Sequence, residues 1–304
     1  MKRFFIIALC ALFAVAACTK PEKGSDSKMP LPKNKAYHAS FTLNDTKFDR
    51  PIKNGDIPKT IELTSGGKFL LGFLDTDAIE PEKAPLAYKS GIYKVLESKA
   101  ISAGLIFEFP KYGTLTVKEG SGNNWTLEYT TAEGEAYEGA ALLSGDVVTG
   151  ELAESICRSW KPREFIVSAS GGNIKNAIVG KKFSADLYEI INYLRDNGVN
   201  INAADYEKYS LESIDYTENG MLFINFKDFA IAPFVGDFSL DESKDDNLHY
   251  DFSLSWEDNP VIPVTGVGSV TVIDSQMTLY TESDAVVGGK SYHVSVSIIC
   301  DEIK

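Results

Sequence analysis

The sequence predicts a mostly β protein with two tandem antiparallel β-domains, the second of which contains an inserted α-helix. Three observations lead to this prediction. Short apolar or alternating segments, separated by glycine-containing turns, fill most of the chain after residue 36. Two of the predicted hairpins match each other in sequence. Only one long segment, residues 184–197, combines helical spacing of apolar residues with start and stop signals.

The chain begins with a predicted signal peptide, residues 1–17. A basic start precedes an apolar stretch over residues 4–14, which is too short for a permanent span of roughly 20 residues. The ending Val-Ala-Ala-Cys resembles the bacterial lipobox, which implies lipid attachment at Cys18 and cleavage before it. No Asp follows Cys18, and by analogy with proteobacterial sorting this favours the outer membrane, at its periplasmic face or at the cell surface. The alternative is an ordinary signal peptide cleaved elsewhere.

Composition divides the remaining chain into a tether and two domains. Residues 18–35 are polar and Lys-rich and contain three prolines, which predicts a lipid-anchored flexible tether. We expect an N-terminal antiparallel β-domain over residues 36–148 and a second β-barrel domain over residues 149–304.

The first domain is predicted to contain strands only. Ser65-Gly66-Gly67 and Gly122-Asn123-Asn124 supply turn residues that tolerate positive φ. The expected strands are residues 37–43, 60–64, 68–73, 91–96, 105–109, 113–117, 125–130 and 137–143.

The second domain is predicted to start with a short helix, residues 151–158, followed by a strand over residues 160–169. A longer helix over residues 184–197 has Ser184 as its expected N-cap, a staple between Phe183 and Tyr188, and Gly198 as its stop. The expected strands after it are residues 213–216, 220–226, 234–240, 248–256, 263–273, 277–281 and 292–300.

The sequence contains an internal repeat. Residues 60–73 align without gaps to residues 213–226, with identities at Ile61/Ile214, Thr64/Thr217, Gly67/Gly220 and Phe73/Phe226. Downstream, residues 90–95 resemble residues 235–240, and residues 125–129 resemble residues 277–280. The order is the same in both halves, so we predict two similar domains in tandem.

Motifs of the second half indicate a family. The run Ile-Cys-Arg-Ser-Trp-Lys at residues 156–161, the run Ser-Gly-Gly-Asn at residues 170–173 and a helix between the first two strands are similar to uncharacterised lipocalin-like (calycin-type) lipoproteins of gut Bacteroides. The resemblance covers the second half well and the first half loosely. It implies calycin-like β-barrels, and it brings no functional residues because the group has no assigned activity.

The charge balance excludes one class of partner. The net charge is −13, and removal of Lys2 and Arg3 leaves 28 basic and 43 acidic residues, or −15. Nucleic acid is therefore not an expected partner, since phosphate binding requires a basic face. We interpret the acidity mainly as a contribution to solubility.

No metal or cofactor site is expected. The histidines are His38, His249 and His293, and His249 and Asp251 share a strand face that should point to solvent. The acid-dense loop at residues 241–247 lacks the Gly and the final Glu of a calcium loop, which favours a solvated hairpin tip. No nucleophile elbow or phosphate-binding loop occurs, so we expect no enzyme. The alternative is an enzyme on the same scaffold that uses a pair of carboxylates, for which the sequence does not single out two residues.

Two cysteines remain in the folded region, Cys157 before the first strand of the second domain and Cys300 in its last strand. First and last strands are neighbours in a closed barrel, which is compatible with a disulfide. The alternative is two buried free thiols that pack as small hydrophobic side chains.

Aromatic residues near strand ends are the remaining candidates for ligand contact, because aromatic rings at a barrel mouth stack on sugars or contact acyl chains. They are Trp125, Trp256, Tyr112, Tyr137 and Phe234. The sequence as a whole predicts a non-catalytic outer-membrane lipoprotein that binds a glycan, a lipid or a protein partner. The alternatives are a carrier of a small apolar ligand in a barrel cavity and a structural envelope protein.

Overall fold

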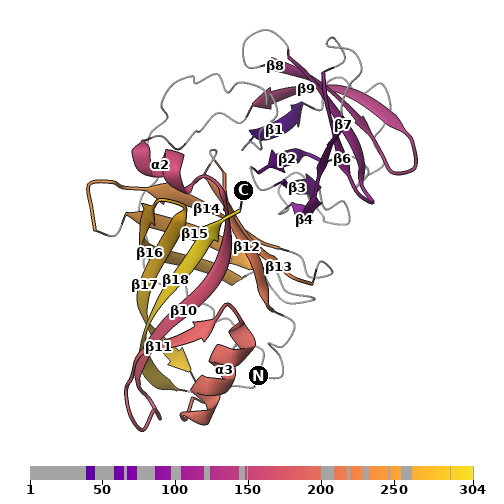
Figure 1. Cartoon of the computed structure of the whole chain (residues 1–304). Coiled ribbons are helices and arrows are strands. Elements are labelled where there is room, and N and C mark those ends of the chain that lie inside the picture. Colours follow the sequence, from indigo (N-terminus) through magenta and orange to yellow (C-terminus); the bar gives the residue numbers. More distant parts are fainter. Residues whose placement is uncertain are drawn as a thin grey trace. The chain divides into compact units, whose positions relative to one another are not determined.

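The computed structural model describes residues 39–44, 58–64, 67–73, 86–96, 104–119, 124–143, 148, 150–199, 209–217, 220–228, 233–245, 247–254, 262–287 and 289–303. These residues form two compact units (Figure 1). One unit comprises Val148–Tyr216 and Gly220–Ile303, and the other contains the strands before Val148. Within the described ranges, no helix has the length and apolar character needed to cross a membrane.

The first unit is a nine-stranded antiparallel sheet with the order β4-β3-β2-β1-β9-β8-β7-β6-β5. Its strands are β1 (Ala39–Asn44), β2 (Thr60–Leu63), β3 (Lys68–Phe73), β4 (Ala87–Ile92), β5 (Lys94–Leu96), β6 (Leu105–Phe109), β7 (Gly113–Glu119), β8 (Asn124–Thr130) and β9 (Ala136–Leu143). Every predicted strand overlaps an observed one. The expected strand over residues 91–96 is longer than predicted and is interrupted at Tyr93.

The second unit is built on a closed antiparallel barrel of eight strands, β10 and β12 to β18, because β10 pairs with β12 on one edge and with β18 on the other. The strands are β10 (Ser159–Gly171), β12 (Leu211–Tyr216), β13 (Met221–Phe226), β14 (Phe234–Leu240), β15 (Leu248–Leu254), β16 (Ile262–Ile273), β17 (Gln276–Val287) and β18 (Lys290–Glu302). A further strand, β11 (Ile178–Ser184), pairs along β10 beyond the short β10–β12 contact. The helices are α2 (Glu151–Ile156) and α3 (Leu187–Asp196).

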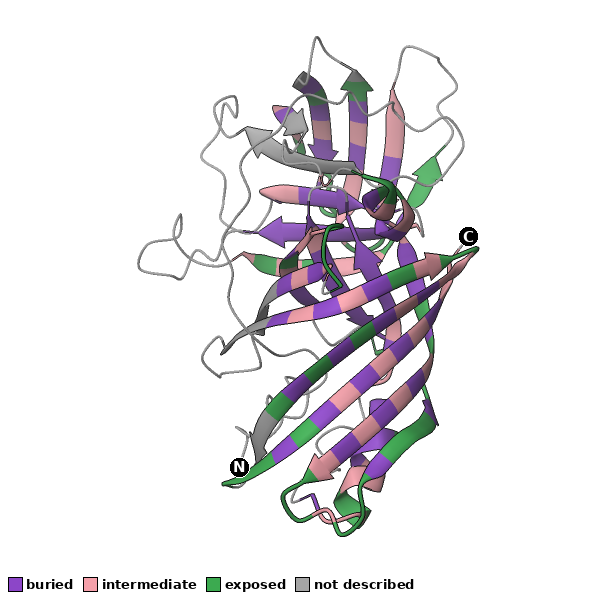
Figure 2. Ribbon diagram, turned by 90° about the vertical axis from the view of Figure 1, so that its left-hand side faces the viewer, coloured by how far each residue is buried: buried purple, intermediate pink, exposed green. Residues whose placement is uncertain are grey.

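Side chains alternate between the barrel interior and its outer surface, as the banding of the long strands in Figure 2 shows. In β18, Tyr292, Val294, Val296, Ile298 and Cys300 are buried, whereas the residues between them are exposed or half-buried. This period of two is the sequence signal that made the strands predictable.

The internal repeat is present in the structure with the same hairpin register. Glu62 pairs with Leu70 in the first unit, and the aligned residues Asp215 and Phe223 pair in the second. The aligned glycines that end the two turns, Gly67 and Gly220, have φ values of 76° and 81°, a conformation that favours glycine.

The agreement extends to the next strand. The Tyr93 amide donates to the Gly67 carbonyl over 2.8 Å, and at the aligned positions the Phe238 amide donates to the Gly220 carbonyl over 2.7 Å. β14 is therefore the counterpart of β4 and β5 taken together. Both sheets are meanders in which the first strand pairs with the last, β1 with β9 and β10 with β18.

The first unit is not shown to close into a barrel. β4 pairs with β3 and β5 pairs with β6, and among the described residues no strand pair joins β4 to β5. The prediction of two barrels is thus confirmed for the second unit, while the first unit is shown only as an open sheet whose two ends are adjacent in sequence.

The longer helix is shorter than predicted, and its start is different. α3 begins at Leu187, and its N-cap is Asp186, whose carboxylate accepts from the Tyr188 amide over 2.9 Å. Ser184 ends β11 and donates its hydroxyl to Glu189 over 2.6 Å. The expected cap at Ser184 is therefore wrong, because the preceding strand, which the sequence analysis did not predict, extends to that residue.

Candidate functional site

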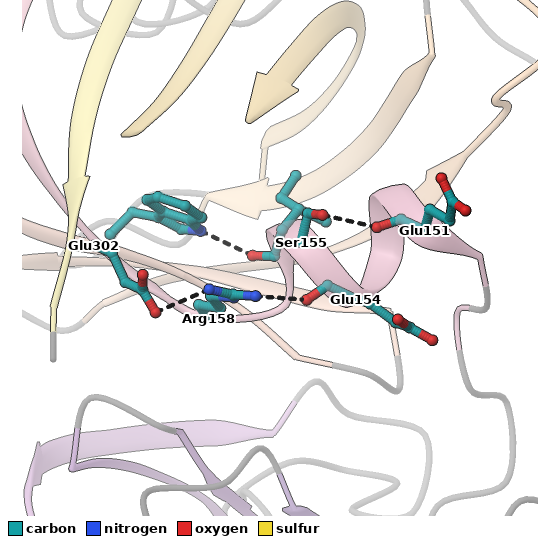
Figure 3. A network of polar contacts seen from close by, with 7 residues as sticks. Glu151, Glu154, Ser155, Arg158 and Glu302 are labelled. Carbon is teal, nitrogen blue, oxygen red and sulfur yellow. Dashed lines mark hydrogen bonds and ion pairs between the residues drawn. The ribbon is translucent and has the colours of Figure 1, made fainter. Parts of the chain in front are cut away.

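Helix α2 covers one end of the barrel and is fixed at its C-terminal end (Figure 3). Trp160 is fully buried, and its indole Nε1 donates to the Ile156 carbonyl over 2.8 Å. The Arg158 guanidinium donates to Glu302 Oε1 over 3.0 Å and to the Glu154 carbonyl over 3.2 Å. These bonds join α2 to the first and last strands of the barrel.

The N-terminal end of α2 is held by the acid-dense loop between β14 and β15. Glu242 Oε1 accepts from the Leu152 amide over 2.9 Å. In the same loop, Asp241 accepts from the Ser243 hydroxyl and forms an ion pair with Lys244 at 3.0 Å. These contacts, the Ser243 hydrogen bond first, lower the pKa of Asp241 to about 2. The described carboxylates of this loop at positions 241 and 242 thus have structural partners.

Helix α3 covers the opposite end of the barrel (Figure 1). Leu187, Ile190 and Ile191 are buried and belong to the same apolar core as the inward residues of the barrel strands. The Phe183 and Tyr193 rings pack edge to face next to this helix, with centroids 5.2 Å apart. A helix therefore lies over each end of the closed barrel.

The barrel interior contains tyrosine hydroxyls with different partners. The Tyr250 hydroxyl lies 3.3 Å from Thr281 Oγ1. The hydroxyls of Tyr216 and Tyr292 are buried without a hydrogen-bond partner in the described part of the chain. Burial raises the pKa of Tyr216 well above the ordinary tyrosine value, so this hydroxyl is neutral at physiological pH.

Cys157 and Cys300 are not joined by a disulfide in the structure, and both are buried. Cys157 is the C-cap of α2, and Cys300 lies on the inward side of β18. Burial raises the pKa of the Cys300 thiol above its ordinary value, which keeps it protonated and poorly reactive. The arrangement corresponds to the alternative of two packed thiols.

Four of the five aromatic candidates are described, and they are divided between the two units. Trp125 and Phe234 are buried in the cores of the two units. Tyr112 and Tyr137 are partly buried against the core of the first unit. Trp256 lies outside the described residues. Ligand contact through these residues stays a prediction.

A polar cluster that the sequence analysis did not identify lies on the outer face of β17 and β18. The Tyr280 hydroxyl donates to Glu282, and this hydrogen bond is the main cause that raises the pKa of Tyr280. His293 Nδ1 lies 3.0 Å from Asp284 Oδ1, and its Nε2 lies 4.0 Å from Glu282 Oε1. We call Tyr280, Glu282, Asp284 and His293 the outer cluster.

The outer cluster was missed because the predicted strand stopped at Thr281, whereas β17 extends to Val287. The signal was available: Tyr280, Glu282 and Asp284 alternate with Thr281 and Ser283, as side chains on opposite faces of a strand do. The inward positions are Thr and Ser, so the segment lacked the apolar residues that marked other strands.

The other histidines do not add to this cluster. His249 is half-buried on β15 between the buried Leu248 and Tyr250, as its predicted outward orientation requires. His38 lies outside the described residues. In the ranges that the structure describes, no group of three or more His, Cys, Asp or Glu side chains is arranged to hold a metal ion.

Comparison with known proteins yields little. No protein-family model and no curated protein sequence matches the chain. Among solved structures, the chain is similar to a mutant of the vaccine antigen transferrin binding protein B from Haemophilus parasuis Hp5, at 8% identity and a TM-score of 0.24. The match covers 89% of this chain and 60% of that one, and at this TM-score it supports no inference about this chain.

Proposed function

We propose that this protein is a lipid-anchored lipoprotein of the outer membrane that binds a ligand without transforming it. The ligand classes are a glycan, a lipid or a protein partner. One observation carries the proposal: the barrel has an apolar core with a helix over each end, while a linked set of polar side chains, the outer cluster, lies on an exposed sheet face. This arrangement suits recognition at the surface of a rigid module.

The repeat supports a second part of the proposal, that the first unit also closes into a barrel. Its end strands β4 and β5 are separated only by Tyr93, and together they occupy the place that the single strand β14 holds in the second unit. If β4 and β5 act as one bent strand, the first sheet closes on itself as the second does.

The anchor is tested first. We expect the wild-type chain to fractionate with membranes and to lose residues 1–17, with a diacylglyceryl mass on its first residue. A Cys18→Ala variant should lose both the mass and the membrane association. Membrane association that persists in this variant without an acyl group would contradict the proposal.

Binding is tested with a soluble chain that starts at residue 19. We expect it to bind a glycan on an array, a lipid in vesicles or a protein in envelope extracts, each confirmed with the purified component. The absence of binding in all three assays would favour a structural role instead.

A second candidate function is a carrier of a small apolar ligand. The buried hydroxyls of Tyr216 and Tyr292, which have no partner among the described residues, favour it because a ligand with one polar end could engage them inside the barrel. Native mass spectrometry that shows a co-purified small molecule, or uptake of a fluorescent fatty acid, would support this function.

A further inference from the structure

Helix α2 is attached differently at its two ends. At the C-terminal end, the Trp160 indole donates to the Ile156 carbonyl over 2.8 Å. The Arg158 guanidinium bridges the Glu154 carbonyl and Glu302 of β18 (Figure 3). Since Trp160 belongs to β10, these bonds fix the last turn of the helix to the long β10–β18 strand pair.

The N-terminal end of α2 is capped from another part of the chain. The N-cap residue is Gly150, which has no side chain to cap the helix. The Leu152 amide instead donates to Glu242 Oε1 over 2.9 Å, and these two residues are 90 positions apart in the sequence. Glu242 lies in the loop between β14 and β15, and its side chain is exposed. We call the hydrogen bond between Glu242 and Leu152 the latch.

The helix has little stability of its own. It has six residues, of which Ala153 and Ile156 are buried and Leu152 is half-buried. Helices shorter than about 12–15 residues are marginal in water, so α2 depends on its contacts with the barrel and on the latch. Helix α3 has ten residues, and its N-cap residue, Asp186, caps it directly. Of the two helices, α2 is therefore the one that should open at lower free energy.

Gly150 is required for the geometry of the latch. Its φ of 114° lies in a region that favours glycine. A Cβ atom at this position would lie 2.6 Å from Glu242 Oε1, the same oxygen that accepts from Leu152. A side chain at residue 150 would therefore strain the backbone and displace the Glu242 carboxylate.

We propose that α2 is a lid over this end of the barrel, closed by the latch and hinged at its C-cap, Cys157. When Glu242 is released, the first turn lifts, while Trp160 and Arg158 retain the last turn. The inference concerns a movement of the fold and goes beyond the proposed binding function. For a barrel that carries a small molecule, the lid marks the entry near Tyr216, whose amide donates to the Arg158 carbonyl over 3.1 Å.

The test is hydrogen–deuterium exchange of the chain from residue 19, with mass spectrometry of peptides from α2, α3 and β18. Glu242→Ala removes the latch, so the amides of α2 should exchange about fivefold faster or more, as expected for loss of a helix cap. Gly150→Ala should have the same effect. Glu242→Gln should restore much of the protection, because its amide oxygen still accepts a hydrogen bond. Exchange in α3 and β18 should not change.

The matched control is Asp186→Ala. It removes the same kind of hydrogen bond, from a helix amide to a carboxylate, at the opposite end of the barrel. Exchange should become faster in α3 and stay unchanged in α2. Unchanged α2 exchange in Glu242→Ala would overturn the proposal. Equal acceleration in α2 and β18 would overturn it as well, because the variant would then have weakened the whole barrel.

A second measurement shows whether the movement uncovers the barrel interior. Cys300 is buried on the inward side of β18, two residues before Glu302, which bonds to Arg158 below the helix. In Glu242→Ala, a small thiol reagent should label Cys300 about fivefold faster than in wild type. Circular dichroism and a thermal transition within about 2 °C of wild type confirm that the variant is folded. Faster α2 exchange without faster labelling would show a frayed helix that covers nothing, and the lid would be wrong.

These outcomes are independent of the proposed function. Neither measurement contains a ligand, so an α2 that never opens by itself would leave the binding function standing. Conversely, the absence of binding in all of the ligand assays would leave the movement of the lid intact.

Discussion

Removal of one oxygen atom from the barrel interior should make the protein more stable. Tyr216 is fully buried, and its hydroxyl has no hydrogen-bond partner in the described part of the chain. The Tyr216→Phe substitution keeps the ring, which packs edge to face on Phe238 at a centroid distance of 5.0 Å. The variant therefore isolates the contribution of the hydroxyl.

The expected magnitude follows from two opposing terms. A buried hydroxyl without a partner costs about 1–3 kcal/mol of desolvation free energy, which the Phe variant recovers. Removal of the oxygen also removes a few of its dispersion contacts, each of which contributes about 0.1–0.2 kcal/mol. We therefore expect the free energy of unfolding to rise by about 1 kcal/mol, or about 2–4 °C in the transition temperature of a domain of this size.

The control variant is Tyr250→Phe in the same barrel. Tyr250 is also buried, but its hydroxyl lies within hydrogen-bond distance of Thr281, so the same chemical change should lower the free energy of unfolding by about 1 kcal/mol. Urea unfolding followed by tryptophan fluorescence measures both variants. If Tyr216→Phe destabilises the barrel as much as Tyr250→Phe, the Tyr216 hydroxyl has a partner such as a buried water, and the reasoning is refuted.

Three further predictions concern pH, surface charge and thiols. Burial raises the pKa values of Tyr216 and Cys300 in the folded state, so their contribution to stability is complete below the pKa values of the unfolded chain and is lost as the pH rises above those values. The free energy of unfolding, measured from pH 8 to pH 11, should therefore fall with rising pH, and it should fall less steeply in Tyr216→Phe. Glu128 and Glu138 face each other across β8 and β9, so Glu138→Lys should raise the free energy of unfolding by about 0.2–1 kcal/mol, and no gain in a urea titration would contradict this. In the chain from residue 19, Cys157 and Cys300 should react with a thiol reagent only after unfolding, and the absence of thiol reactivity in denaturant would instead indicate a disulfide.

Much of the strand arrangement could be predicted because each strand carries its own local signal. The hairpin over residues 60–73 has two apolar strands on either side of a glycine-containing turn, in which Gly67 has a positive φ, so the bounds of both strands could be predicted to within one residue. The repeat added non-local information, since it indicated that distant segments have the same neighbours.

The errors occurred where two signals overlapped. Ser184 precedes a helical pattern and looks like a cap, yet it also ends β11, a strand in which only Ile178 and Phe183 are buried, and pairing with β10 decides the outcome. Asp186 was available as the cap two residues later. Side-chain periodicity alone cannot show which of two nearby cap residues the tertiary structure selects.

The candidate site was less predictable than the fold. Glu282, Asp284 and His293 come together only because β17 and β18 pair with Asp284 opposite His293. That register depends on the hairpin turn and on the inward residues of both strands. The sequence analysis named no partner for His293, since none of the five residues on either side of it is acidic.

Strands β11 and β12 both pair with the same edge of β10, and this has a consequence for the motions of the barrel. β12 pairs with β10 only at Ser159 and Trp160, and β11 takes over that edge from Glu164 onward, with α3 following it in the chain. Among the described strand pairs of the barrel, the β10–β12 pair is therefore a weak junction, because only two residue pairs join the strands there. Local opening should therefore start between β10 and β12, whereas β11 stays paired with β10 and moves with the long wall of β10, β18 and β17.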